Sequence, residues 1–333
     1  MKGICYVFRK KNPIFFSIEK VFYPIIEDIE RKGWATHLIE VPYYSSNFFS
    51  ILRNIRLVKN QKADLYHVTG DIHYTVFAFP RKKTILTIHD CVFLYQQKGF
   101  KRWLMIQLFL KWPVWYAAKV TTISERSKMD IVRFGKCKPE KVVVIPNPLP
   151  KNILPSPYNF NSHCPIILFI GSTPNKNLER VIDALEGINC HLEIVGKVNE
   201  LIEQRLKKKG IKFQYSYNLN DEQLNEKYSE ADLLLFPSLF EGFGLPIIEA
   251  QMVGRPVITS NFSPMSEVAG AGAHLVDSYD LASIRAGVLK IISDRDYRRV
   301  LVEAGYKNVN RFSIEKISNQ YVQIYREFTY LML

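Results

Sequence analysis

Two glutamates and a proline between residues 237 and 261 have the types and spacing of a site for a phosphorylated ligand. The segment reads PSLFEGFGLPIIEAQMVGRPVITSN, and Pro246 suits the first helical position, because a proline loses no needed N–H there. The N–H groups and positive dipole of a helix start favour a diphosphate. Glu249, one turn further on, can accept hydrogen bonds from vicinal hydroxyls such as those of a ribose. With Glu241 on the preceding loop, the segment predicts a pocket for a nucleotide sugar.

Glycines on the same loop would let a ligand approach the backbone. Gly242 and Gly244 have no side chain and tolerate unusual backbone angles. A plain strand, turn and helix with solvated glutamates is the structural alternative, and a Gly-x-Gly tripeptide alone does not exclude it. The combination of glutamates, glycines and proline over the whole segment favours the ligand site.

A second loop carries a basic residue between an expected strand and an expected helix. The sequence ILFIGSTPNKNLER places Gly171 at the end of the strand, Lys176 in the loop and Asn177 as the cap of the next helix. Ligands bind at the carboxyl ends of parallel strands in open α/β sheets. Lys176 can therefore neutralise a diphosphate, although a lone loop lysine is more often only solvated.

Histidines and aspartates end two expected strands in the first half of the chain. TILTIHD sets His89 and Asp90 at one strand end. Side chains at such ends can face a ligand, but they can also be core residues or cap the following helix. The other strand end, LYHVTGDIHY, carries His67, Gly70, Asp71 and His73.

The positive charge of the chain is confined to its first half. Of a net charge of +13, residues 1–150 hold 25 Lys and Arg against 11 acidic residues, whereas residues 151–333 hold 20 against 21. This asymmetry indicates an anionic partner for the first half, either nucleic acid or an anionic membrane surface. No known nucleic-acid-binding motif is present, so the membrane surface is the expected partner and nucleic acid is not.

The segment 99–119, GFKRWLMIQLFLKWPVWYAAK, has two interpretations. It is rich in Trp, Leu and Phe but is interrupted by Gln107, Lys111 and Pro113, so it is too broken to span a bilayer. It could lie in a membrane interface with basic and aromatic anchors. The alternative is a buried helix of the first domain, and both hold if one face is core and the other contacts lipid.

Apolar strand-like runs alternate with helical patterns, which is typical of parallel sheets built from β-α-β units. The alternation breaks at 146–165, where six prolines and little periodicity indicate a linker between domains. The final pattern, about 313–328, predicts a long helix. The expected strands are 3–8, 35–41, 64–68, 84–88, 120–123 and 141–145 before the linker, and 166–170, 191–195, 211–214, 232–236, 257–260 and 273–276 after it.

Length and composition agree with a cytoplasmic protein of two domains. The 333 residues, 47% of them hydrophobic, can fill two cores. Five scattered cysteines without a Cys-x-x-Cys pair indicate reduced thiols rather than disulfides or a zinc site. The N-terminal MKGICYVFRKKNP predicts a first strand and not a signal peptide. No dense cluster of histidine, cysteine and carboxylate residues is evident, so we expect no metal and no cofactor.

The segment 237–261 resembles the paired-glutamate signature of glycosyltransferase family 4, the group 1 glycosyl transferases, which are retaining enzymes of the GT-B fold. The resemblance covers most of the chain and implies an α/β fold of two Rossmann-like domains facing a cleft. It implies an acceptor-side domain at 1–150, a nucleotide-sugar-binding domain at 151–333, and a last helix that crosses back to the first domain. The segments that carry it are LTIHD (86–90), VTTISERSKMDI (120–131), KVVVIPNP (141–148), ILFIGSTPNKNLERVIDAL (167–185) and residues 228–277.

The resemblance also assigns roles to residues. A phosphate-binding lysine of the family matches Lys176, and a histidine that contacts the donor sugar matches His89. Glu241 would orient sugar hydroxyls, so the implied catalytic residues are His89, Glu241 and Lys176. The implied donor-binding residues are Gly171, Lys176, Glu241, Gly242, Phe243, Gly244, Leu245, Pro246 and Glu249. Acceptor or cleft contacts are expected from His67, Gly70, His73 and Asp90.

One departure and three alternatives accompany these roles. Ser172 and Asn175 stand where many relatives have arginines, which implies weaker diphosphate binding. The expected reaction moves a sugar from a UDP- or GDP-linked donor to a glycan or lipid-linked acceptor, as in bacterial lipopolysaccharide or capsule synthesis at the inner face of the membrane. The alternatives are a nucleotide-sugar epimerase of the same fold, a catalytically silent binding subunit, and a basic nucleic-acid binder.

Overall fold

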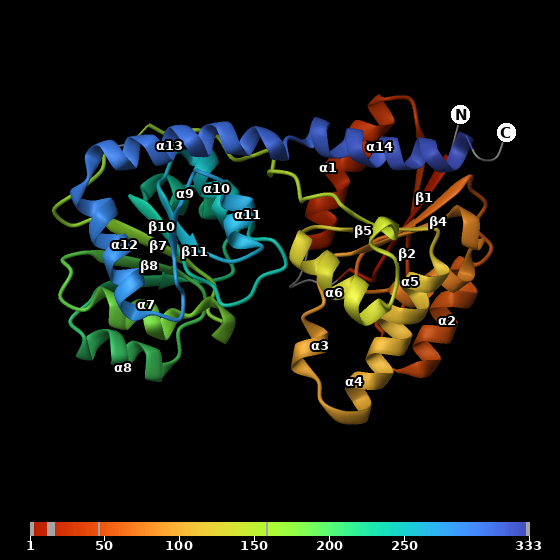
Figure 1. Ribbon diagram of the computed structural model, residues 1–333, viewed down its shortest axis with the longest axis horizontal. Coiled ribbons are helices and arrows are strands. Elements are labelled where there is room, and N and C mark those ends of the chain that lie inside the picture. Colours follow the sequence, from red (N-terminus) through yellow and green to blue (C-terminus); the bar gives the residue numbers. More distant parts are fainter. Residues whose placement is uncertain (1–2, 12–16, 46, 158, 331–333) are drawn as a thin grey trace. The chain divides into compact units, whose positions relative to one another are not determined.

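The computed structural model describes residues 3–11, 17–45, 47–157 and 159–330, and the chain divides into two compact units (Figure 1). The first unit comprises Met1–Pro148 and Ser313–Leu333, and the second comprises Leu149–Phe312. Each unit contains a six-stranded sheet in which all pairings are parallel. The predicted α/β class is therefore confirmed.

The sheet of the first unit has the strand order β2-β1-β3-β4-β5-β6. Its inner strands are uninterrupted runs such as Leu65–Val68 and Thr84–Ile88, which are buried throughout, because helices cover both faces of a parallel sheet. The strands are β1 (Gly3–Phe8), β2 (Ala35–Glu40), β3 (Leu65–Val68), β4 (Thr84–Ile88), β5 (Lys119–Thr122) and β6 (Val142–Val144).

Helices from both ends of the chain pack together in the first unit. Helix α14 packs across α1 (Figure 1), and Tyr321 and Tyr325 of α14 are buried with Phe22 of α1. The Tyr325 hydroxyl lies 3.1 Å from that of Tyr6 in β1. The helical elements are α1 (Ser17–Arg31), α2 (Phe48–Val58), η1 (His73–Ala78), η2 (Arg81–Lys83), α3 (Phe93–Gln96), α4 (Gly99–Met105), the π-helical η3 (Ile106–Lys111), α5 (Trp112–Tyr116), α6 (Glu125–Gly135), η4 (Pro139–Lys141) and α14 (Ile314–Tyr330).

The second unit has the strand order β12-β11-β10-β7-β8-β9. Its strands are β7 (Ile166–Ile170), β8 (His191–Val195), β9 (Lys212–Ser216), β10 (Leu233–Phe236), β11 (Val257–Ser260) and β12 (His274–Val276). Its helical elements are η5 (Pro174–Lys176), α7 (Leu178–Leu185), α8 (Glu200–Lys208), α9 (Asp221–Glu230), α10 (Leu245–Val253), α11 (Met265–Ala269), α12 (Leu281–Ser293), α13 (Arg295–Val309) and η6 (Asn310–Phe312). All twelve expected strands are present, each within two residues of its predicted bounds.

The proline-rich segment 146–165 differs from the free linker that its composition indicates. The unit boundary falls near its start, and the rest packs on the second unit. The Ser156 N–H donates to the Val253 carbonyl (3.2 Å), and the Asn161 N–H donates to Asp232 (2.8 Å). The prolines lack N–H groups and keep the segment out of the sheet, while amides such as those of Ser156 and Asn161 bind acceptors of the second unit.

The aromatic segment 99–119 combines features of both of its interpretations. Leu110 and Val114 are fully buried in the core of the first unit. On the other side of the same helical segment, Phe100, Trp103 and Trp115 remain 75%, 53% and 61% exposed. No helix in the described part of the chain combines the length and apolarity needed to cross a bilayer.

Candidate functional site

The two loops predicted to bind a diphosphate meet at the switch point of the second sheet. Strands β7 and β10 are neighbours there, and the strand order runs outward from them in opposite directions. Such a switch point leaves a crevice at the carboxyl ends of the strands, which is where open α/β sheets bind ligands. The loop 171–177 follows β7, and the loop 237–244 follows β10.

Lys176 and Glu241 join these loops directly. The Lys176 Nζ donates to Glu241 Oε1 over 2.7 Å, and the two side chains are 18% and 14% exposed. The ammonium also lies 4.6 Å from the centre of the Phe236 ring at the end of β10. The structure thus brings together two of the predicted catalytic residues, which are 65 positions apart in sequence.

Gly171 makes room for the lysine. Its φ of +100° is a left-handed value, and a Cβ added here would lie 2.7 Å from Cε of Lys176. Any side chain would therefore displace the Lys176 stem from its course over the strand end. Gly171 acts in the site by this close approach.

Two asparagines fasten the lysine loop to its neighbours. Asn175 donates to the Phe240 carbonyl (2.8 Å), and its own carbonyl accepts from the Leu239 N–H (2.7 Å). Asn175 thus aligns the two loops where many relatives have a cation. Asn177 stands at the start of α7 as predicted, but its side chain makes no capping bond and donates instead to the Ser278 carbonyl (2.7 Å). The prediction that the Asn177 side chain caps α7 was wrong. Asn177 has a φ of +71°, and its side chain is directed to the loop after β12.

Helix α10 begins one residue earlier than predicted. Leu245 is its first residue and Pro246 its second, and Gly244 precedes them with a φ of +110°. Pro246 has no N–H, and the N–H of Ile247 donates to the Gly244 carbonyl (3.0 Å), so the amides left for a ligand precede Pro246. The Phe243 ring is buried edge-on against the Phe312 ring, and this contact anchors the loop.

Glu249 has a partner that the sequence pattern did not reveal. The hydroxyl of Tyr228 in α9 donates to Glu249 Oε2 over 2.6 Å, and both side chains are buried. Burial and the neighbouring carboxylate raise the pKa of Tyr228 well above its usual range, so the hydroxyl keeps its proton. Tyr228 therefore holds one carboxylate oxygen in place, and no spacing signal in the sequence marks this tyrosine.

Exposed aromatic residues and a lysine lie at the carboxyl ends of β8 and β9. The Gly196 N–H donates to the Ser216 carbonyl (2.7 Å), which holds the two loops together. Tyr215 and Tyr217 are 39% and 52% exposed, and the Lys197 ammonium lies 5.6 Å from the Tyr217 ring centre.

In the first unit, three predicted residues gather at the carboxyl ends of β3 and β4. His73 and Asp90 are electrostatic neighbours, as are His73 and His89. Burial, together with His73 and Arg9, lowers the pKa of His89 to about 3, so its ring is neutral near pH 7. The buried Nε2 of His89 has no hydrogen-bond partner among the described residues. An unpaired buried nitrogen is costly, so this atom is available to a ligand hydroxyl.

Contacts within the first unit involve three of the residues expected at the acceptor site, His67, Gly70 and His73. His67 is fully buried, and its ring nitrogens bind the hydroxyls of Tyr325 and Thr87 at 2.7 Å each, which leaves neither for a ligand. Gly70 has a φ of +81°, and a Cβ there would lie 2.8 Å from Cδ1 of Ile18. His73 is buried and bonds the Phe109 carbonyl through Nδ1.

The described residues contain no group of three or more histidine, cysteine, aspartate or glutamate side chains placed to hold a metal ion. The five cysteines are free, and Cys5, Cys91 and Cys190 are buried.

Comparison with known proteins matches both units to glycosyltransferases. The profile "Glycosyl transferases group 1" matches residues 151–308, and "Glycosyltransferase Family 4" matches residues 26–151. O-antigen chain mannosyltransferase B of Escherichia coli is 26% identical over 236 residues, which span 63% of this chain and 61% of that protein. O-antigen chain mannosyltransferase RfbU of Salmonella typhimurium is 26% identical over 82% of this chain and 78% of its own.

A solved structure shows the same fold. HepE of Anabaena, in complex with UDP and glucose, superposes with a TM-score of 0.75 at 14% identity and covers 98% of this chain and all of its own. The two adjoining profile matches, the two parallel sheets and this similarity identify the chain as a member of glycosyltransferase family 4, the group 1 glycosyl transferases of the GT-B fold.

Proposed function

We propose that this protein transfers a sugar from a nucleoside-diphosphate sugar to a glycan or lipid-linked acceptor, with retention at the anomeric carbon, in the synthesis of a cell-surface polysaccharide. The observation that carries the proposal is the Lys176–Glu241 pair at the switch point of the second sheet. It sets a cation for a phosphate beside a carboxylate for sugar hydroxyls. The relatives named as O-antigen mannosyltransferases support the polysaccharide pathway.

The donor would be held at three points. Lys176 and the amides before Pro246 would take the diphosphate, whose negative charge competes with Glu241 for the ammonium. Glu249, held by Tyr228, would accept the ribose hydroxyls. Tyr215 and Tyr217 would lie against the base. A fold neighbour that binds UDP and glucose supports a nucleotide donor.

The chemistry asked of these residues is mainly electrostatic. As the bond from the anomeric carbon to the diphosphate breaks, Lys176 stabilises the negative charge that develops on the leaving oxygen. Glu241, released from the lysine, orients the sugar hydroxyls, and a diphosphate oxygen takes the proton of the acceptor hydroxyl on the same face. His89 is neutral, so it binds a sugar hydroxyl without adding charge.

We also propose that the exposed side of 99–116 lies on an anionic membrane surface. Phe100, Trp103 and Trp115 are the aromatic anchors, and the exposed Lys98 and Lys101 are the basic ones. Flotation with phosphatidylglycerol vesicles tests this. Lys98→Gln with Lys101→Gln should reduce binding, while the charge-matched control Lys59→Gln with Lys62→Gln should not. Equal binding by both double variants would remove the proposal.

The transferase proposal is tested first by thermal shift against UDP, GDP, ADP and their common sugars, because a ligand of the folded state raises Tm. The nucleotide that stabilises the protein then serves as donor with candidate acceptors, and NMR of the product gives its anomeric configuration. We expect a shift for one nucleotide that is lost in Glu249→Ala, and a product with the donor's configuration. An inverted product, or a donor epimerised without acceptor, would contradict the proposal.

A further inference from the structure

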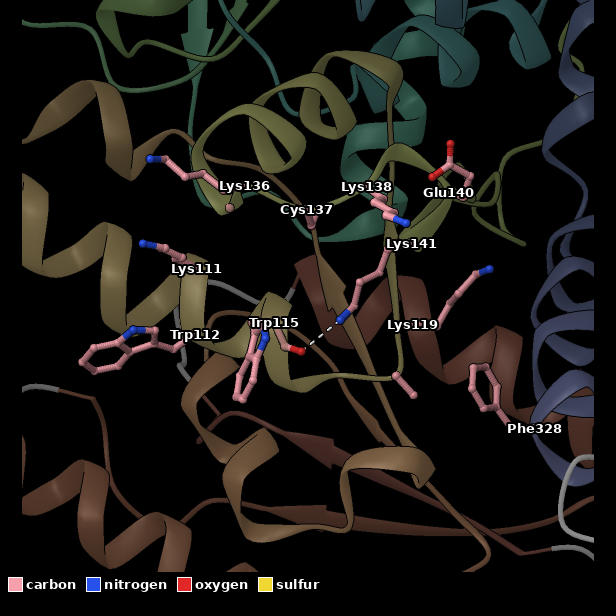
Figure 2. A pocket seen from close by; sticks show the side chains of 12 residues that line it. Lys111, Trp112, Trp115, Lys119, Lys136, Cys137, Lys138, Glu140, Lys141 and Phe328 are labelled. Carbon is pink, nitrogen blue, oxygen red and sulfur yellow. Dashed lines mark hydrogen bonds between the residues drawn. The ribbon is translucent and has the colours of Figure 1, made fainter.

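The first unit contains a basic pocket at the opposite edge of its sheet from His89. It has a volume of about 550 Å³ and lies where β5 and β6 begin, whereas His89 follows the end of β4 (Figure 2). Trp112, Trp115 and Phe328 are its large apolar lining residues. Five lysines line it together with one carboxylate, Glu140: Lys111, Lys119, Lys136, Lys138 and Lys141.

The lysines of the pocket are not neutralised by the protein. None of the five forms an ion pair within the described ranges of the chain. Figure 2 shows Lys111 and Lys136 reaching to one side, Lys119 and Lys138 to the other, and Lys141 between them. The Glu140 carboxylate points away from Lys141. A cluster of this kind has a positive potential that favours an anion.

Two cations converge on the carbonyl oxygen of Trp115, a residue that lines the pocket. The Lys141 Nζ donates to the Trp115 carbonyl over 3.0 Å, and Nη2 of Arg81 donates to the same oxygen over 3.1 Å. The Arg81 guanidinium lies 4.2 Å from the centre of the Trp115 ring. Burial and the nearby Arg81 lower the pKa of Lys141. An anion bound in the pocket beside Lys141 would offset this repulsion.

Lys136 occupies a backbone conformation that usually belongs to glycine. It follows the last turn of α6 with φ 51° and ψ 48°, the left-handed position that commonly ends a helix. A residue with a Cβ is strained in this region relative to glycine. The chain thus has a lysine at the rim of the pocket where glycine would be less strained, which points to a use for the ammonium.

We propose that this pocket binds a phosphate group, carried by a lipid headgroup or by a soluble phosphate ester, at a site separate from the donor site. Lysine ammonium groups bind phosphate as point charges and can approach it from several sides. Trp112 and Trp115, which are 48% and 61% exposed, offer ring faces to the group that carries the phosphate. The site does not depend on the transferase reaction.

The test compares three variants of the full chain, each made in a Lys176→Gln background so that phosphate bound at the candidate donor site does not contribute. Lys136→Gly removes an ammonium and relieves the left-handed backbone. Lys119→Gln with Lys138→Gln removes two more. Lys59→Gln with Lys62→Gln is the charge-matched control, since both lysines are exposed and neither lines the pocket. Tm, titration with inorganic phosphate and glycerol 3-phosphate, and flotation with phosphatidylcholine vesicles with and without phosphatidylglycerol are measured for each.

We expect phosphate affinity to fall about two- to fivefold for each ammonium removed, with no loss of Tm in Lys136→Gly and no change in the control. Loss in the soluble titrations identifies a phosphate ester as a sufficient ligand. Loss confined to phosphatidylglycerol vesicles identifies a lipid headgroup. If pocket and control variants bind alike in both assays, or if no form binds phosphate in either, the proposal is wrong.

Discussion

Replacing Lys176 should weaken the binding of a nucleoside diphosphate, whereas replacing Glu241 should not weaken it. In the free protein the Lys176 ammonium is bound to Glu241 at 2.7 Å, so an incoming phosphate must compete with this carboxylate. Lys176→Gln removes the cation that binds the phosphate. Glu241→Gln removes the competitor and leaves the cation in place.

The magnitudes follow from the exposure of the pair. Both side chains are less than one-fifth exposed, so a charge-assisted hydrogen bond to phosphate should contribute about 1.5–3 kcal/mol. Lys176→Gln should therefore weaken diphosphate binding roughly 10- to 150-fold. A partly solvated ion pair contributes less, up to about 1 kcal/mol, so Glu241→Gln should leave binding unchanged or tighten it by up to about fivefold.

Calorimetry with the sugar-free nucleoside diphosphate measures both affinities, because it excludes contacts between Glu241 and the sugar. Both variants should lose activity in a transfer assay. Glu241→Gln should lose it because the carboxylate that orients the sugar hydroxyls is gone. Equal weakening of diphosphate binding in the two variants would show that the ion pair only supports the fold. Unchanged binding in Lys176→Gln would refute the assignment of Lys176 to the phosphate.

Three further predictions concern stability. Tyr228→Phe removes the hydroxyl that donates to the buried Glu249 and should lower the free energy of unfolding, measured by urea titration, by about 1–3 kcal/mol. The control Tyr215→Phe changes an exposed tyrosine and should alter this free energy by less than about 0.5 kcal/mol. Similar losses in the two variants would contradict the role of Tyr228. The pKa values of His67 and His89 are about 3, below the 6.5 of an unperturbed histidine, so the unfolded chain binds these two protons at a higher pH than the folded chain does. The free energy of unfolding should therefore fall as the pH drops from 6.5 toward 3, by up to about 1.4 kcal/mol per pH unit for each histidine. His89→Asn should reduce this slope, and an unchanged slope would show that His89 does not contribute. Gly70→Ala should destabilise more than Gly33→Ala, because both glycines have a positive φ but only at Gly70 does a Cβ meet a neighbour, Ile18; Ile18→Val should restore part of the loss, and equal effects at the two glycines would rule out the clash.

The elements of the fold were largely predictable because their signals are local. Inner strands such as β7 and β10 are short apolar runs bounded by Gly, Pro or charged residues, and burial on both faces of a parallel sheet requires such a run. The start of α10 was predicted to within one residue from Pro246, because proline fixes its own φ. The parts of the candidate site that lie on a single loop were likewise visible in the sequence.

Contacts between distant segments were not predictable from the pattern. His67 ends a strand-like run just as His89 does, yet its ring lies in the interior against Tyr325, which is 258 residues away. Nothing in the sequence distinguishes Tyr228 from other helix residues, but in the structure its hydroxyl donates to Glu249. Asn177 was expected to cap α7, but the neighbouring β12 loop supplied a better acceptor for its side chain. In each case the partner is set by sheet order, which a single sequence does not encode locally.

The sequence by itself thus determined the alternation of strands and helices, the helix start at the phosphate loop and the uneven distribution of charge, since each depends on neighbours along the chain. Only the tertiary structure decided that Lys176 binds Glu241 and that lysines from η3, the end of α6, the start of β5 and the η4 turn line one pocket. The physical reason is that pairing and burial depend on which segments the sheets bring side by side.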